Sequence, residues 1–199
     1  IDGREKAIGA SQYLADIKLP GMLQVRFVKS PLAHARIISI DTSAAEALPG
    51  VVAVVTHADV PDVRVGEVVM DQRLFAKEKV RYVGDIVAGV AAEDLETARR
   101  AVELVQVEYE ELPPVFSAEE AMDPGAPVLH EEYPSYETIP PVADAHETMK
   151  DHNLCWKGML KKGDLDKGFA EADEIVEDTF EIPASQGSPI ETHGVVAAP

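Results

Sequence analysis

The chain has 199 residues, a length that suits one or two domains, and 46% of them are hydrophobic, which is enough for a core. Its net charge of −18 gives an acidic surface that repels phosphate, which excludes nucleic acid as an expected partner. One cysteine, Cys155, can neither form an internal disulfide nor hold an iron–sulfur cluster, which needs about four thiolates. We therefore expect a cytoplasmic protein with an inert thiol.

The first predicted elements are strands. Residues 23–27 alternate apolar and polar side chains, which is the period of a half-buried strand, and residues 35–40 follow as a second strand. After a Pro-Gly turn, the apolar run 51–55 predicts a strand covered on both faces. That run and residues 86–92 are far shorter than the roughly 18–20 residues that span a bilayer, so we expect no membrane span.

Residues 86–110 read as strand, helix, strand. Residues 86–92 are small or β-branched, Asp94 can cap a helix that follows, and residues 103–111 return to a period of two. The helical connection is near the minimum length for a parallel crossover, which predicts a parallel pair. Together these elements predict an α+β fold, with a first domain at residues 1–116.

Residues 117–155 change character, because prolines interrupt regular structure and acidic side chains fill the gaps. We predict an extended linker that wraps over a surface, with at most a short helix at residues 118–122. Apolar side chains anchor it in this interpretation: Val128, Leu129, Tyr133, Tyr136 and Ile139. A free disordered linker is the alternative.

The third region, residues 156–199, is expected to begin a second domain. Asp164 can cap a short helix at residues 165–172, and residues 174–182 and 192–198 read as strands. The chain begins with Ile rather than Met and ends in an apolar run, so we expect a piece of a longer polypeptide.

Few residues suggest chemistry. No phosphate-binding loop, dinucleotide fingerprint or nucleophile elbow occurs, and the six histidines lack zinc-site spacing. His34 and Arg36 can bind an anion, but His34 more readily fixes a turn between two strands. Asp85 follows a glycine and is expected to cap a turn. We expect no catalytic residue and no metal ligand in the chain.

A second small group lies near the end of the sequence. In a strand, Glu191 and His193 would project from one face, where a carboxylate beside an imidazole can move protons or bind a metal. A structural role near a site is the other interpretation, and Gln186 lies in a flexible approach suited to a pocket wall. These three residues are the candidates for cofactor binding.

Taken in order, these segments resemble a known family. The hammerhead-like segments are residues 21–23, 30–37, 48–54, 59–61, 80–84, 107–113 and 119–121. They are similar to the α/β hammerhead domain at the start of the large subunit of xanthine dehydrogenases and aldehyde oxidases. Residues 163–164, 169–173 and 190–194 resemble the opening of the molybdopterin-binding domain of the same subunit. Asp85 departs from the glutamine that is common in the family.

The resemblance implies the chemistry of a complete subunit. It would hold molybdenum on a pterin dithiolene, commonly as the cytosine dinucleotide, and hydroxylate an aldehyde or an N-heterocycle with oxygen from water. Electrons would pass to iron–sulfur and FAD partners, and the rest of the large subunit would be this chain's first neighbour. The family's glycine-rich pterin loops and catalytic glutamate match nothing in these 199 residues. We therefore expect a scaffold that is inactive alone and binds no molybdopterin tightly.

Two other hypotheses remain. Residues 1–100 hold 13 basic and 14 acidic residues, whereas residues 101–199 hold 5 and 22, a balance of −1 against −17. Such asymmetry also suits a free-standing acidic interaction module that docks a basic partner. A small metallohydrolase centred on Glu191 and His193 is the third hypothesis, and it requires bound zinc.

Overall fold

The computed structural model describes residues 3–67, 69–138, 153–154, 160, 162–183 and 185–198. The chain forms two compact units, one of residues 21–158 and one that joins residues 1–20 to residues 159–199. The predicted anchor Ile139 and the thiol of Cys155 lie outside the described residues. Within the described residues, no helix is both long and apolar enough to cross a membrane.

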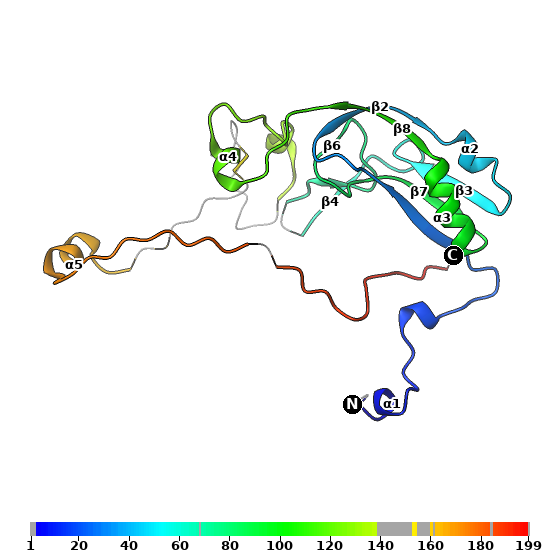
Figure 1. The fold of residues 1–199 in the computed structure, drawn as a ribbon, viewed down its shortest axis with the longest axis horizontal. Helices are drawn as coiled ribbons and strands as arrows, with labels where there is room; N and C mark the ends of the chain where they lie inside the picture. Colours follow the sequence, from blue (N-terminus) through cyan, green and yellow to red (C-terminus); the bar gives the residue numbers. More distant parts are fainter. Residues whose placement is uncertain are drawn as a thin grey trace. The chain divides into compact units, whose positions relative to one another are not determined.

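The larger unit is built on an antiparallel sheet in the order β1-β7-β3. Its strands are β1 (Gln24–Lys29), β7 (Ile86–Ala92) and β3 (Val51–Thr56), and helix α3 (Leu95–Leu104) packs against it (Figure 1). The central strand β7 has small side chains, which let the helix approach closely. Asp94 caps α3 as predicted, because its Oδ1 accepts from the backbone N–H of Thr97 at 2.8 Å.

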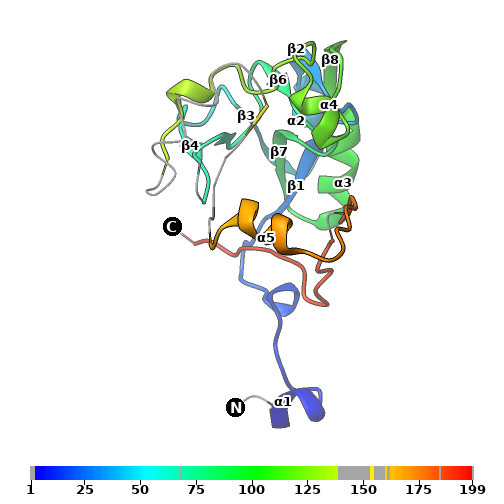
Figure 2. The same ribbon diagram turned by 90° about the vertical axis from the view of Figure 1, so that its left-hand side faces the viewer.

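A second antiparallel sheet has the order β6-β2-β8 (Figure 2). Its strands are β6 (Lys79–Val80), β2 (Ala35–Asp41) and β8 (Gln106–Glu111). The predicted parallel pair is therefore wrong: β7 and β8 lie in different sheets, and each pairs with antiparallel neighbours. Helix α3 carries the chain from one sheet to the other instead of returning it to the same sheet.

The prediction that residues 51–55 are covered on both faces is also wrong. Strand β3 is an edge strand and Val52 is 57% exposed, whereas Val87 and Val90 of the central strand are fully buried. Gly50 precedes β3 with a φ of +90°, a left-handed conformation in which a side chain would also crowd Thr97. An apolar run alone does not distinguish the centre of a sheet from its edge.

Two apolar clusters form the core of the larger unit. One lies between the first sheet and α3 and is centred on Val28, Ala88 and Val90, with helix α2 (Ser43–Glu46) adding Ala45. The other lies beside the second sheet and is formed by Ala35, Ala76, Val80 and Val87. These buried residues are small or medium-sized, in keeping with the low aromatic content.

Residues 117–138, which we call the connector, belong to the larger unit and lie against the rest of it. The connector holds helix α4 (Ala118–Met122), as predicted, and the short 3-10 helix η2 (Tyr133–Ser135). A two-stranded sheet of β4 (Arg64–Val65) and β5 (Gln72–Arg73) precedes it in the chain. Val69 forms an isolated antiparallel bridge to Thr138 at the connector's end.

The described residues of the smaller unit form three short helices: α1 (Gly3–Ala7), the 3-10 helix η1 (Leu14–Asp16) and α5 (Leu165–Glu171). Helix α5 and its cap Asp164 were predicted. The strands predicted at residues 174–182 and 192–198 are not formed within the described residues. A strand needs a hydrogen-bonded neighbour, and the described residues supply none, so Val176, Phe180 and Ile182 are 84–90% exposed.

Candidate functional site

His34 is a structural residue in this arrangement. It is 5% exposed, and its Nδ1 lies 2.8 Å from the carbonyl oxygen of Pro113. A carbonyl only accepts, so Nδ1 carries the proton and Nε2 accepts from the Lys79 ammonium at 3.4 Å. Arg36 pairs instead with Glu110 across the neighbouring strand. The structure does not bring His34 and Arg36 together as an anion site.

Asp85 organises the turn that leads into β7. Its Oδ2 accepts from the backbone N–H of Arg81 at 3.1 Å, and its backbone carbonyl accepts from Ser30 at 2.8 Å. Burial raises the pKa of Asp85 above its ordinary value, although the hydrogen bond from Arg81 and its charge act in the opposite direction. The expected role as a turn cap is confirmed.

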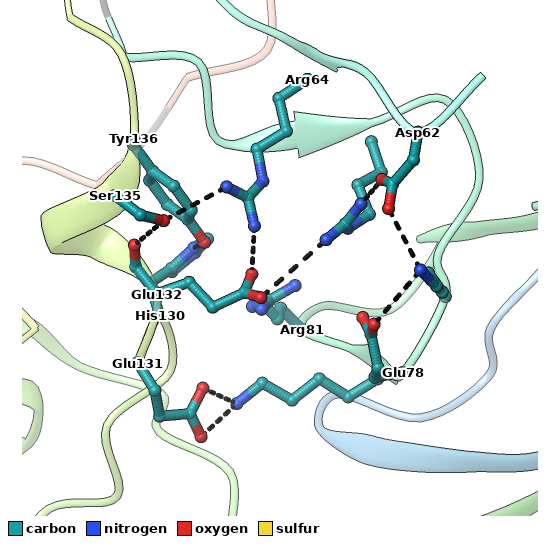
Figure 3. A network of polar contacts seen from close by, with 12 residues as sticks. Asp62, Arg64, Glu78, Arg81, His130, Glu131, Glu132, Ser135 and Tyr136 are labelled. Atoms are coloured by element: carbon teal, nitrogen blue, oxygen red, sulfur yellow. Dashed lines mark hydrogen bonds and ion pairs between the residues drawn. The ribbon is translucent and has the colours of Figure 1, made fainter.

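A network of polar contacts joins the connector to the rest of the larger unit, and Figure 3 shows it from close by. We call residues 129–136 the clasp, because they make most of the contacts by which the connector takes part in this network. Arg81 Nε donates to the carbonyl oxygen of Leu129 at 2.8 Å, and Lys79 Nζ donates to Glu131 at 2.7 Å. Partial burial acts to raise the pKa of Glu131, but the Lys79 hydrogen bond, a backbone hydrogen bond and the charges of Lys79 and Arg81 together hold that pKa below its ordinary value.

Glu132 lies between two arginines at the other end of the clasp. It pairs with Arg64 and lies 3.9 Å from Arg73, whose second partner is Asp62 (Figure 3). The side chains of Arg64 and Arg73 are only 21% and 16% exposed, so both cations are largely removed from water. A partly buried cation without a carboxylate is costly, and Glu132 supplies that carboxylate.

Tyr136 is the apolar anchor of the clasp. It is 4% exposed, and the Arg64 guanidinium carbon lies 4.5 Å from its ring centroid. The ring of His130 meets it edge-on at 5.8 Å, with Nδ1 3.1 Å from the Tyr136 hydroxyl. Burial, reinforced by Arg81, lowers the pKa of His130, while burial raises the pKa of Tyr136. The network therefore holds a chain segment in place, and every cation named in it has an acceptor.

The clasp was only partly foreseen. Tyr136 was predicted as an anchor, but its partners Arg64 and His130 were not. A signal was present: residues 64–81 carry five basic residues and residues 131–132 are both glutamate. Such complementary charge indicates contact only if the two segments meet in space, and the sequence separation of about 50–70 residues hides that.

A groove of about 510 Å³ lies on the larger unit between β2 and the end of β3. Its polar lining includes Ser39, Asp59 and Lys77, together with His57, whose Nδ1 is buried without a hydrogen-bond partner in the protein. The carboxylate of Asp59 is already engaged by the backbone and hydroxyl of Thr56, which lower its pKa. The hydroxyl of Thr42, also in the lining, donates to the carboxylate of Glu46 at 2.6 Å, so this acid too has a protein partner.

The three cofactor-binding candidates all lie in the smaller unit and are exposed. Glu191 Oε1 accepts a hydrogen bond from the backbone N–H of Leu14 at 2.9 Å, so its carboxylate already has a protein partner. The structure does not join Glu191 to His193 or Gln186 as a site. In the part of the chain that the structure describes, no three His, Cys, Asp or Glu side chains lie close enough to hold a metal ion.

Comparison with known protein families identifies the class to which the two-sheet domain belongs. Residues 8–113 match the family model described as "Aldehyde oxidase and xanthine dehydrogenase, a/b hammerhead domain", and residues 145–199 match the molybdopterin cofactor-binding domain. The chain belongs to the aldehyde oxidase and xanthine dehydrogenase family. It joins a hammerhead domain to sequence of the molybdopterin-binding domain.

Similar proteins of known sequence and of known structure support this family membership. The chain is 41% identical over its whole length to a probable xanthine dehydrogenase subunit of Bacillus subtilis (strain 168), covering 24% of that protein. It is also 41% identical, over 96% of its length, to the "Carbon monoxide dehydrogenase large chain" of Afipia carboxidovorans, again covering 24%. The solved CO dehydrogenase from Oligotropha carboxidovorans matches 66% of this chain and 17% of its own, with 43% identity and a TM-score of 0.61. The chain spans about a quarter of the length of the two sequence relatives.

The described residues of the smaller unit do not by themselves fit a molybdopterin. Among residues 162–183 and 185–198, every residue except Val196 is exposed, so no buried polar group waits for a cofactor. A cofactor of this size needs an enclosed site with convergent donors.

Proposed function

We propose that this chain is the N-terminal part of the molybdopterin-binding subunit of a cytoplasmic molybdenum hydroxylase. The complete subunit would hydroxylate an aldehyde or an N-heterocycle with oxygen from water, using molybdenum on molybdopterin in its cytosine dinucleotide form. Electrons would leave through iron–sulfur and FAD subunits or domains. The observation that carries the proposal is the succession of two family matches, at residues 8–113 and 145–199, in one chain.

Within that subunit the chain acts as a scaffold. We propose domain limits of 1–116 for the hammerhead, 117–155 for the linker and 156–199 for the start of the molybdopterin-binding domain. The clasp supports this division, because it fixes the described part of the linker on the hammerhead by ion pairs and by the buried ring of Tyr136. A fixed linker determines where the chain leaves the hammerhead.

The candidates Gln186 and His193 stay part of the proposal as residues that face the cofactor in the complete subunit. Cofactors supply the redox chemistry in enzymes of this kind, while the protein supplies binding and orientation. This chain contributes no proton transfer or electron transfer of its own in our proposal, since Glu191 is paired with a backbone N–H and Gln186 and His193 are exposed.

A chimera tests the proposal. This chain would replace the corresponding N-terminal quarter of the Bacillus subtilis relative, to which it is 41% identical, and molybdenum would be measured by mass spectrometry. We expect the chimera to retain molybdenum and substrate-dependent dye reduction, and the 199-residue chain alone to hold well under one molybdenum per chain. The nucleotide released by acid would be cytidine monophosphate.

Two outcomes would count against the proposal. Stoichiometric molybdenum on the isolated chain would place the cofactor site within these residues. A folded chimera without molybdenum would show that this chain cannot serve the family's scaffold. A matched chimera carrying Phe116→Ala, at a side chain that is 79% exposed, controls for unspecific loss of folding.

A further inference from the structure

Leu14 contacts the smaller unit's other segment through its backbone. The turn at residues 13–17 closes on itself, because Tyr13 donates to Asp16 Oδ2 at 3.0 Å and Asp16 donates back to the Tyr13 carbonyl at 2.9 Å. The N–H of Leu14 takes no part in these bonds. It donates instead to Glu191 Oε1 at 2.9 Å, across 177 positions of sequence.

The side chain of Leu14 meets the same motif at a second point. A Cβ built at position 194 would collide with Leu14 Cδ2, so Gly194 leaves the space that the leucine fills. Gly194 has no positive φ, so its backbone conformation does not require glycine. The close approach of the Leu14 side chain is therefore the reason for a glycine at this position. Leu14 is half-buried, as are Ser11 and Val196, whereas the other described residues of the smaller unit are exposed.

We infer that Glu191 and Gly194 form a dock for the chain's own N-terminal segment. Glu191 receives the backbone N–H of Leu14, and Gly194 receives its side chain. This assigns Glu191 the role of positioning residues 13–17 rather than that of an acid, base or cofactor ligand. Residues 13–17 then belong structurally with the molybdopterin-binding sequence, although the hammerhead match begins at residue 8.

These two contacts account for a polar residue at position 191 and a small residue at position 194. The side chain of Glu191 is long enough for its carboxylate oxygen to reach the backbone of Leu14. Glycine at position 194 lacks the Cβ atom that would collide with the side chain of Leu14. His193, which lies between them, has no part in the dock. The dock does not depend on the proposed enzymatic activity and can be tested on the 199-residue chain.

The first test is hydrogen exchange at a single amide, that of Leu14, followed by NMR. We expect Glu191→Leu and Gly194→Val to speed this exchange about fivefold or more, the effect of losing one hydrogen bond. Glu191→Gln keeps an acceptor oxygen and should stay near the native rate. His193→Leu, next to Gly194 and two positions from Glu191, is the matched control and should also leave the rate unchanged.

The second test does not depend on the hydrogen bond. With Cys155→Ser to remove the native thiol, Leu14→Cys and Gly194→Cys should form a disulfide under mild oxidation. Leu14→Cys with Val176→Cys should not. Equal exchange of the Leu14 amide in all four variants, or equal cross-linking in both pairs, overturns the dock. Zinc that shifts the NMR signals of Glu191 and His193 together at micromolar concentration would support a metal site in its place.

Discussion

The clasp should open when the ring of Tyr136 is removed. Tyr136 is 4% exposed, its ring contacts Arg64 and His130, and a buried tyrosine hides roughly 150–250 Å² from water. Truncation of a buried aromatic residue to alanine costs about 3–5 kcal/mol. We expect Tyr136→Ala to reduce the free energy of opening residues 129–136 by this amount, since the ion pairs that also hold them have carboxylates that are partly exposed.

Hydrogen exchange measured by mass spectrometry on peptides covering the clasp is the assay. Because each 1.4 kcal/mol is a factor of about ten, their exchange should speed up about a hundredfold or more. Tyr136→Phe removes only the hydroxyl near His130 and should cost about 0.5–1.5 kcal/mol. Phe116→Ala, at an exposed side chain, is the control. Native exchange of the clasp in Tyr136→Ala, with the rest of the chain folded, would refute the assignment of Tyr136 as its anchor.

Three further outcomes are expected. Val90→Ala, at a fully buried position, should lower the free energy of unfolding in urea by roughly 2–3 kcal/mol, whereas Val52→Ala at the exposed edge should change it by less than about 0.5. Gly50→Ala should cost about 1–2 kcal/mol because of the left-handed φ, and an unchanged urea midpoint would contradict this. Burial raises the folded-state pKa of Asp85, so stability falls as pH rises above about 4. Asp85→Asn should therefore raise the melting temperature at about pH 7 and not near pH 3, and an equal effect at both pH values would contradict it.

The local elements were largely predictable from the sequence. Alternation predicted β1 and β8, and Asp94 and Asp164 marked the starts of α3 and α5 correctly, because a capping side chain acts within three residues. The pairing of strands was not predictable in the same way. Residues 86–92 and 106–111 flank a helix as a parallel crossover would, yet the partners that separate them into two sheets are distant in sequence.

The failed strand predictions share a physical cause. Residues 174–182 have the alternating pattern of a strand, but that pattern only specifies which side chains would face a core. Backbone pairing requires a neighbouring strand, and the described residues provide none here. Gln186, Glu191 and His193 were recognised as polar residues in or near a family motif, but the partner of Glu191 lies 177 residues away and no local pattern reveals it.

The charge asymmetry that suggested an external basic partner has part of its explanation inside the chain. Five of the 13 basic residues in the first half lie between positions 64 and 81, and the clasp presents Glu131 and Glu132 to that stretch. Exposed ion pairs contribute little, but the side chain of Lys79 is only 11% exposed, so loss of its carboxylate leaves a poorly solvated cation. Two acidic residues of the second half therefore stabilise the fold of this chain through ion pairs. A basic molecule that docks there meets Glu131 and Glu132 already paired with Lys79 and Arg64.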